Sequence, residues 1–229
     1  MLFDYRTHPG CNKEKNEDAL GFVRDQGSHM FVVCDGVGGL PNGSFASKKA
    51  VQSIIKQFSI SPNSSKARLR DAVDYGQKAV FSLNPKPLGT TMVACVIEKM
   101  YVYSAWCGDS RIYHIRNKEI LWHSYDHNIL HDILNKGAGN KKLFMNPRAL
   151  NRFLGKDAET KSDFHSFSII NGDYILLCTD GLSNYISEDF LVDTITNNHP
   201  DEISNILESH LLSNKINAPD NFTWYIILI

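Results

Sequence analysis

Three aspartates lie where an apolar run of the sequence gives way to a turn that contains glycine. They are Asp35 in VVCDGVGG, Asp109 in SAWCGDSR and Asp180 in ILLCTDGL. Two more aspartates precede apolar runs, Asp18 in KNEDALGF and Asp220 in NAPDNFTW. The five residues are spread over most of the chain, so their side chains can meet only if the fold brings the ends of these runs together.

If they do meet, the carboxylates would form a site for divalent cations. Several carboxylates in one cleft repel each other, which raises their pKa values unless cations neutralise the group. Oxygen ligands from Asp, backbone carbonyls and water suit Mg²⁺ or Mn²⁺, whereas zinc is disfavoured because no paired His or Cys lies nearby. The carbonyl of Gly36 can approach an ion closely because this residue has no side chain.

The alternative is that these residues only make turns. An Asp-Gly pair taken alone is most often an ordinary turn. Here, however, apolar runs end in acids four or five times, while the other turns are rich in Asn and Lys. This repetition favours the metal site.

Hydrophobic periodicity predicts the elements that carry the aspartates. A period of two predicts strands at 1–7, 19–25, 29–34, 164–169, 173–179 and 222–229, with three or four more between 89 and 124. A helical period predicts helices at 43–60, 64–83, 127–136, 188–197 and 200–213. Residues 137–162 are expected to form a loop or flap that carries one short helix.

This order of elements predicts one α+β domain over residues 1–229. Short polar turns at Glu98-Lys99, Gly108-Asp109 and Asn117-Lys118 predict that the strands they join are antiparallel neighbours. Blocks of strands alternate with pairs of helices, which is typical of antiparallel sheets packed together with helices outside.

The composition excludes several classes of function. Lys plus Arg is 24 and Asp plus Glu is 25, so the net charge of −1 gives no broad attraction to nucleic acid or acidic lipid. The start lacks a signal sequence, and no stretch approaches the roughly 18 apolar residues of a membrane span. Five cysteines without C-x-x-C spacing indicate buried thiols rather than disulfides or a zinc site. We therefore expect a cytoplasmic protein.

Six motifs, in order along nearly the whole chain, resemble the metal-dependent protein phosphatases of the PP2C (PPM) type. They are NEDA at 16–19, DGVGG at 35–39, GTT at 89–91, GDSR at 108–111, CTDGL at 178–182 and DN-x-T at 220–223. Residues 124–162 are similar to the flap region of the bacterial members. The resemblance implies a four-layer αββα sandwich, in which two antiparallel sheets are flanked by helix pairs.

The resemblance also implies which residues hold two Mn²⁺ or Mg²⁺ ions. Asp35 would bridge the ions, and the carbonyl of Gly36 would contact one of them. Asp180 and Asp220 would bind the second ion. Such a pair of ions can activate a water molecule for attack on phosphorus without a covalent intermediate.

Other residues match supporting positions of the family. Asp18 and Glu17 are expected to act through waters on the ions. Asp109 matches the residue that holds a third, weaker ion together with Asp180. Asn221 matches the residue that supports the last acid.

Two positions depart from the family pattern. Lys13 stands where family members usually have an arginine that binds the substrate phosphate. An ammonium keeps the charge but cannot bind two oxygens in one plane, so we expect weaker substrate binding with hydrolysis retained. Val37 stands where many eukaryotic members have a histidine that can protonate the leaving group, whereas bacterial members commonly have an apolar residue, which indicates the bacterial branch. Five histidines are candidates for that acid: His8, His114, His123, His127 and His131. A surface or packing role is the alternative for each of them, and His127, in the flap-like YDHN motif, is the first to test.

The implied function is hydrolysis of phosphoserine and phosphothreonine on proteins, opposing a bacterial Ser/Thr kinase, by a protein expected to be a monomer. Two alternatives stay open. A phosphatase fold that only binds phosphoproteins should have lost metal ligands, whereas here all five aspartates are present. A hydrolase of nucleotides or other small phosphoesters would need a pocket for a base or ribose, for which the sequence shows no motif.

Overall fold

The computed structural model describes residues 1–38, 42–83, 87–136 and 148–229. Within these ranges, all strand pairs are antiparallel and form two five-stranded sheets. Sheet A contains, in spatial order, β1 (Leu2–His8), β10 (Phe222–Leu228), β9 (Tyr174–Cys178), β6 (Arg111–Arg116) and β7 (Glu119–His123). Sheet B contains β2 (Ala19–Asp25), β3 (Ser28–Cys34), β4 (Met92–Glu98), β5 (Tyr101–Cys107) and β8 (Asp163–Ser168).

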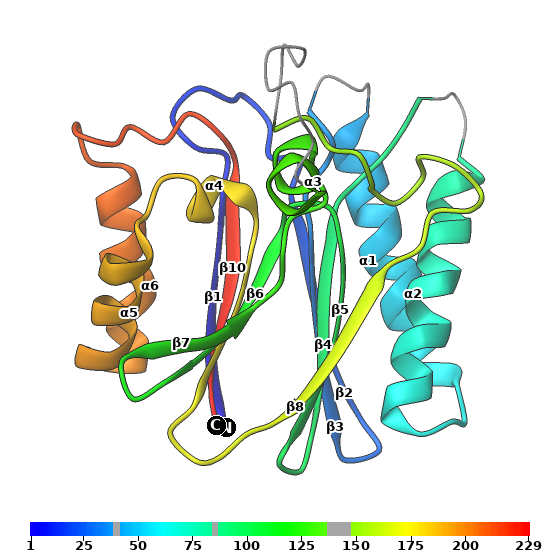
Figure 1. The fold of residues 1–229 in the computed structure, drawn as a ribbon, viewed down its shortest axis with the longest axis horizontal. Helices are drawn as coiled ribbons and strands as arrows, with labels where there is room; N and C mark the ends of the chain where they lie inside the picture. Colours follow the sequence, from blue (N-terminus) through cyan, green and yellow to red (C-terminus); the bar gives the residue numbers. More distant parts are fainter. Residues whose placement is uncertain (39–41, 84–86, 137–147) are drawn as a thin grey trace.

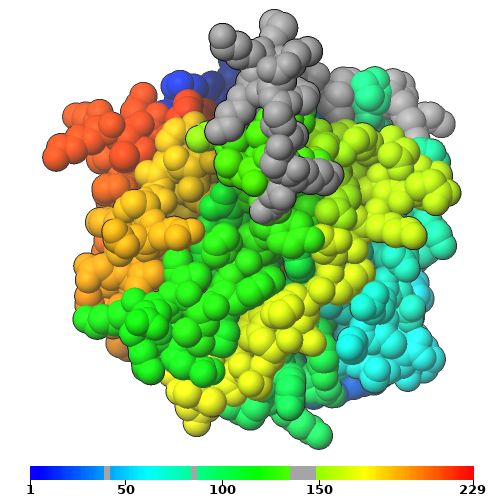
Figure 2. Space-filling model, in the orientation of Figure 1, coloured from blue at the N-terminus to red at the C-terminus, as the bar shows by residue number. Residues whose placement is uncertain are grey.

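A pair of long helices covers the outer face of each sheet (Figure 1). On sheet B these are α1 (Gly43–Ile60) and α2 (Ser65–Phe81), and on sheet A they are α5 (Glu188–Asn197) and α6 (Pro200–Leu211). Figure 2 shows the segments around β7 and β8, in green and yellow, on the face between α5 (orange) and α2 (cyan). The predicted four-layer αββα sandwich is therefore confirmed. None of the helices in the described ranges is long and apolar enough to span a membrane.

The alternation of side chains in β3 explains why the sandwich has a core on each side of a sheet. Met30, Val32 and Cys34 face α1 and α2, whereas Phe31 and Val33 face sheet A. All five are fully buried, because a strand in the middle of such a fold has no face toward water. Each such burial of a large apolar side chain contributes about 1.5–3 kcal/mol.

Most of the predicted elements are present, with bounds that differ by at most two residues. Two short helices were placed differently. The structure adds α4 (Asp180–Ser183), and α3 (Ile129–Lys136) begins two residues later than predicted. The short helix predicted in 137–162 is absent from 148–162, and the rest of that prediction lies outside the described residues.

The prediction that the Gly108-Asp109 turn joins neighbouring strands is wrong. β5 pairs with β4 and β8 in sheet B, whereas β6 pairs with β7 and β9 in sheet A. The chain therefore crosses from one sheet to the other at this turn. Gly108 has a φ of +115°, which favours glycine, and a Cβ there would lie 2.7 Å from the side chain of Thr91.

Candidate metal centre

The strand ends that carry the predicted site residues meet at one end of the sandwich. α4, which begins at Asp180, lies at the upper end in Figure 1, opposite the two chain termini. A cavity of about 160 Å³ opens here. Its lining includes most of the residues that the sequence predicted for the site: Lys13, Glu17, Asp35, Gly36, Asp109, Asp180, Asp220 and Asn221.

The backbone of Asp35 is fixed by two hydrogen bonds to Thr91. Its N–H donates to Thr91 Oγ1 at 3.0 Å, and its carbonyl accepts from the N–H of Thr91 at 2.8 Å. Thr91 Oγ1 also lies 2.6 Å from Ser110 Oγ, next to Asp109. This hydroxyl pair connects the end of β3 to the turn that crosses between the sheets. The sequence showed Thr91 only as part of the GTT motif and did not predict this role.

Gly36 lies where no side chain fits. A Cβ on Gly36 would be 2.5 Å from the carbonyl carbon of Gly43, at the start of α1. The Gly36 N–H donates to the carbonyl of Glu17 at 3.2 Å. The close packing against α1 accounts for this glycine, and it leaves the Gly36 backbone on the wall of the cavity.

Asp18 does not line the cavity but lies buried behind Asp35, with 5% of its surface exposed. Its Oδ2 accepts from Thr179 Oγ1 at 3.0 Å. Its Oδ1 is buried and has no hydrogen-bond partner among the described residues. A buried carboxylate oxygen without a partner is costly, so this atom indicates a missing proton or cation.

Four aspartates of the site have raised pKa values. Desolvation, followed by the charge of Asp18, raises the pKa of Asp35 well above its usual range. Desolvation raises the pKa of Asp18 to about 7. Desolvation and the charge of Asp180 raise the pKa of Asp109 to about 7, while desolvation and Asp220 raise the pKa of Asp180 to about 6. Four carboxyl groups with raised pKa values in one place are typical of a functional site.

The donor set fits hard divalent cations. Every charged acceptor on the cavity wall is a carboxylate, and no His or Cys is among the described residues that line it. In the part of the chain that the structure describes, no three His, Cys, Asp or Glu side chains converge closely enough to hold an ion by themselves. Ions at this site would therefore need backbone and water oxygens as ligands as well. Mg²⁺ usually keeps several water ligands in protein sites.

Lys13 and Asp220 form an ion pair at the edge of the cavity. Lys13 Nζ lies 3.1 Å from Asp220 Oδ1, and both side chains are about two-fifths exposed, at 41% and 42%. A hydrogen bond to Asp220 raises the pKa of Lys13, so its ammonium stays charged. The residue predicted to bind phosphate thus contacts a predicted metal ligand.

The side chain of Asn221 binds three backbone groups beside Asp220. Its Oδ1 accepts from the N–H of Glu17 at 2.8 Å, and its Nδ2 donates to the carbonyls of Pro9 at 2.8 Å and Lys15 at 3.1 Å. Asn221 is almost fully buried. It therefore ties the segment that carries Lys13 and Asp18 to the start of β10.

Replacing Asn221 by Ala is expected to lower the free energy of unfolding by about 2–3 kcal/mol, because three backbone groups lose their partner. Urea unfolding measures the change. Asn12→Ala is the matched control, since Asn12 is exposed in the same segment and has no hydrogen bond among the described residues. Equal stability of the two variants would contradict the role given to Asn221.

None of the five candidate histidines lies on the cavity wall. His127 Nδ1 accepts from the N–H of Gly108 at 3.1 Å, so its proton is on Nε2, which lies 3.3 Å from Asp163 Oδ2. Burial lowers the pKa of His127 to about 4, so the ring is neutral. It supports the turn before Asp109 and does not face the cavity. A packing role was the alternative for each of these histidines, and the hydrogen bond from Gly108 favours that role for His127.

Comparison with known proteins gives a consistent result. The sequence profile of the protein phosphatase 2C family matches residues 11–211. A serine/threonine phosphatase (stp) of Listeria welshimeri is 29% identical over 209 residues, which cover 85% of this chain and 83% of that protein. The protein phosphatase PhpP of Streptococcus pneumoniae is 26% identical over 213 residues, covering 87% of this chain and 86% of the other.

The fold is also similar to solved structures. The structure of the S. agalactiae serine/threonine phosphatase aligns with a TM-score of 0.88 at 21% identity. The alignment covers 100% of this chain and 99% of that one.

Proposed function

Because this chain belongs to the protein phosphatase 2C family, we propose that it hydrolyses phosphoserine and phosphothreonine on proteins with two Mn²⁺ or Mg²⁺ ions bound in the carboxylate cavity. Membership of the family confirms the resemblance that the six motifs showed. The observation that carries the proposal is the meeting of carboxyl groups from both sheets at one cavity, with Asp18 Oδ1 left without a partner.

The ions would be held by the residues that face this cavity. Asp35 and the Gly36 carbonyl would contact them from sheet B, and Asp180 and Asp220 from sheet A, with Asp109 available for a third, weaker ion. Bound divalent cations would lower the pKa of a water molecule and offset the negative charge of the phosphoryl group.

The protein itself supplies orientation and charge. Thr91 holds the backbone of Asp35 by two hydrogen bonds, so the carboxylate keeps its direction as the substrate binds. Asp18 and Glu17 would orient waters from behind and beside Asp35. The ammonium of Lys13 would attract the phosphate of the substrate at the mouth of the cavity. Since no histidine is among the described residues of the wall, the leaving hydroxyl would take its proton from water.

The proposed partners are phosphoproteins and a Ser/Thr kinase that adds the groups removed here. The phosphatase names of the Listeria and Streptococcus relatives support this class of substrate. We propose that the protein acts as a monomer.

The test is release of phosphate from a phosphothreonine peptide by purified protein in Mn²⁺, Mg²⁺ or EDTA. Release in either metal, and none in EDTA, is expected. A small phosphoester assayed in parallel addresses the alternative hydrolase, which would turn it over much faster than the peptide. A folded protein that releases no phosphate in any metal would contradict the proposal and favour a module that only binds phosphoproteins.

Removing the charge of Lys13 is expected to have opposite effects on substrate and metal. In Lys13→Gln the KM for the phosphopeptide should rise about tenfold, because a charge-assisted contact to phosphate is lost. The apparent Kd for Mn²⁺ should fall, because Asp220 loses its competing ammonium. Phosphate release at varied peptide and metal concentrations measures both constants.

Lys13→Arg is the matched variant that keeps the charge. It should lower the KM below that of the natural chain with little change in kcat, since a guanidinium can bind two phosphate oxygens. A KM that is the same in all three proteins would show that residue 13 does not contact the substrate.

A further inference from the structure

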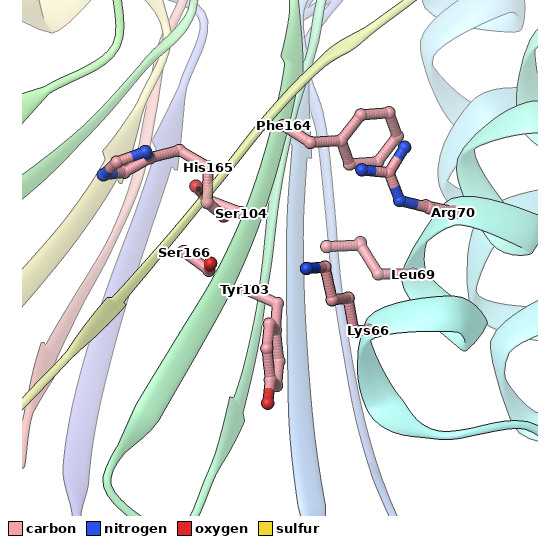
Figure 3. A pocket seen from close by; sticks show the side chains of 8 residues that line it. All are labelled: Lys66, Leu69, Arg70, Tyr103, Ser104, Phe164, His165 and Ser166. Atoms are coloured by element: carbon pink, nitrogen blue, oxygen red, sulfur yellow. Dashed lines mark hydrogen bonds between the residues drawn. The ribbon is translucent and has the colours of Figure 1, made fainter.

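A second cavity, of about 180 Å³, lies between α2 and the strands β5 and β8 of sheet B. It shares no lining residue with the carboxylate cavity. Figure 3 shows Lys66, Leu69 and Arg70 reaching from α2 toward Tyr103 on β5 and toward Phe164 and Ser166 on β8. The side chain of His165 lies on the other side of β8, where its ring stacks on Trp122 at 4.3 Å.

The lining is cationic and holds no acid. Lys66 and Arg70 are its charged groups, and no Asp or Glu is among its described lining residues. Neither has an ion pair or side-chain hydrogen bond with any residue that the structure describes. Arg68 and Arg111, by contrast, each pair with an aspartate. Two unpaired cations at one concave site are a ready place for an anion.

The guanidinium of Arg70 is held in place without using its N–H groups. Its Cζ lies 4.2 Å from the centre of the Phe164 ring, in a cation–π contact. This contact orients the planar group and leaves its donors for another partner, so little freedom is lost when an oxyanion binds. In Figure 3 the ammonium of Lys66 points toward the hydroxyl of Ser166, which can donate a further hydrogen bond.

We propose that Lys66, Arg70 and Ser166 form a binding site for a phosphate-sized oxyanion, distinct from the carboxylate cavity. The buried side chain of Leu69 and the rings of Tyr103 and Phe164 form apolar walls, which suit the carbon atoms next to a bound phosphoryl group. The oxyanion has two sources, free phosphate or a phosphorylated side chain of a protein. Only the second source rests on the proposed function.

Calorimetric titration of the full chain in EDTA tests the site. Without divalent cations the carboxylate cavity is acidic and is expected to repel phosphate, and the proposed function predicts no turnover, so binding is measured apart from catalysis. The probes are inorganic phosphate, a phosphothreonine peptide and the same peptide without phosphate. Binding of at least one phosphate-containing probe is expected, and it should weaken as salt rises.

Variants assign the binding to this cavity. The double variant Lys66→Gln, Arg70→Gln should weaken binding at least about tenfold, since each contact of a charged donor to phosphate is lost. Lys56→Gln is the control, because Lys56 is exposed on α1 and lies outside the cavity. Circular dichroism and thermal unfolding check that each variant is folded, and Arg70→Lys supplies a milder change should the double variant unfold.

The outcomes separate the sources and the two proposals. Binding of both phosphate probes favours free phosphate as the ligand, and binding of the phosphopeptide alone favours a protein. Equal binding of the unphosphorylated peptide, no saturable binding, or a Kd unchanged in a folded variant would overturn the site. Loss of phosphate release in the earlier assay with binding intact would overturn only the proposed function.

Discussion

Asp35→Asn is expected to lower metal-dependent release of phosphate by at least about a hundredfold. Removal of a group that only supports a metal ligand already lowers metal affinity or activity about ten- to a hundredfold, and Asp35 is proposed to be a ligand itself. Asp35 is the acid between the two sheets, and its backbone is fixed by Thr91 on one side while Asp18 lies behind it. The amide keeps the shape of the side chain but loses the charge that would hold a cation. Phosphate release from a phosphothreonine peptide in Mn²⁺ measures the effect.

The same substitution is expected to raise the melting temperature in EDTA. Desolvation, and then the charges of Asp18, Asp180 and Asp109, raise the pKa of Asp35, so near neutral pH the chain must either bury this charge or take up a proton when it folds. A neutral amide at this position avoids that cost. Thermal unfolding of the two proteins provides this readout. Asp74→Asn is the control, since Asp74 is exposed on α2 and should change neither quantity. A variant that loses activity and also melts lower would indicate a packing role for Asp35 instead.

In EDTA, the protein is expected to be more stable at about pH 6 than at about pH 8. An aspartate whose pKa is raised on folding stabilises the folded state fully below its unfolded pKa of about 3.9, and loses that contribution as the pH rises through its folded pKa. Those folded values are about 7 for Asp18, about 7 for Asp109 and about 6 for Asp180. The free energy of unfolding should therefore fall between pH 6 and 8. Each unit by which the pKa in the folded protein exceeds the pKa in the unfolded chain corresponds to about 1.4 kcal/mol.

His127 changes the stability of the folded state in the opposite direction, but its effect between pH 6 and 8 is smaller than that of the aspartates. Its pKa is lowered to about 4 in the folded protein, so it destabilises the folded state as the pH falls below its ordinary value of 6.5. At pH 6 that loss is about 1 kcal/mol, which is less than the summed contribution of several carboxyl groups.

Mn²⁺ should remove most of this pH dependence. At about pH 8 the ion would neutralise the carboxylates and raise the melting temperature, and at about pH 6 protons would compete with it, so its effect should be smaller. Melting curves at both pH values, with Mn²⁺ or EDTA, provide the measurement. In Asp35→Asn, the difference between the melting temperatures at the two pH values should be smaller. A melting temperature in EDTA that rises from pH 6 to pH 8 would contradict the electrostatic account of the cavity.

The local parts of the fold could be predicted from the sequence. Helix α1 was predicted with its observed bounds of 43 and 60, because its apolar residues repeat with the helical period and no strand pattern competes. The Gly108-Asp109 turn shows the limit of such predictions. Its residues are those of a hairpin, but whether two strands pair depends on distant partners, here β8 and β9, which no local pattern reveals.

The same distinction applies to the site. The acids and glycines could be recognised because they follow or precede apolar runs in motifs. The burial of Asp18 behind Asp35 and the pairing of Lys13 with Asp220 depend on contacts between residues far apart in the chain, so no spacing encodes them. His127 was singled out for its motif, yet the backbone of Gly108 holds its ring away from the cavity.

The pairing of the first and last strands has a practical consequence for labelling and fusion. Leu2 lies opposite Leu228, and both ends of the chain emerge at the end of the sandwich remote from α4 and the cavity (Figure 1). A tag, a fluorophore or a surface anchor attached at either end would leave the mouth of the cavity open to a large substrate. The two ends are also near enough to be joined by a short linker. New ends could then be opened in the turn between β2 and β3, giving a permuted protein whose reporter sits on sheet B.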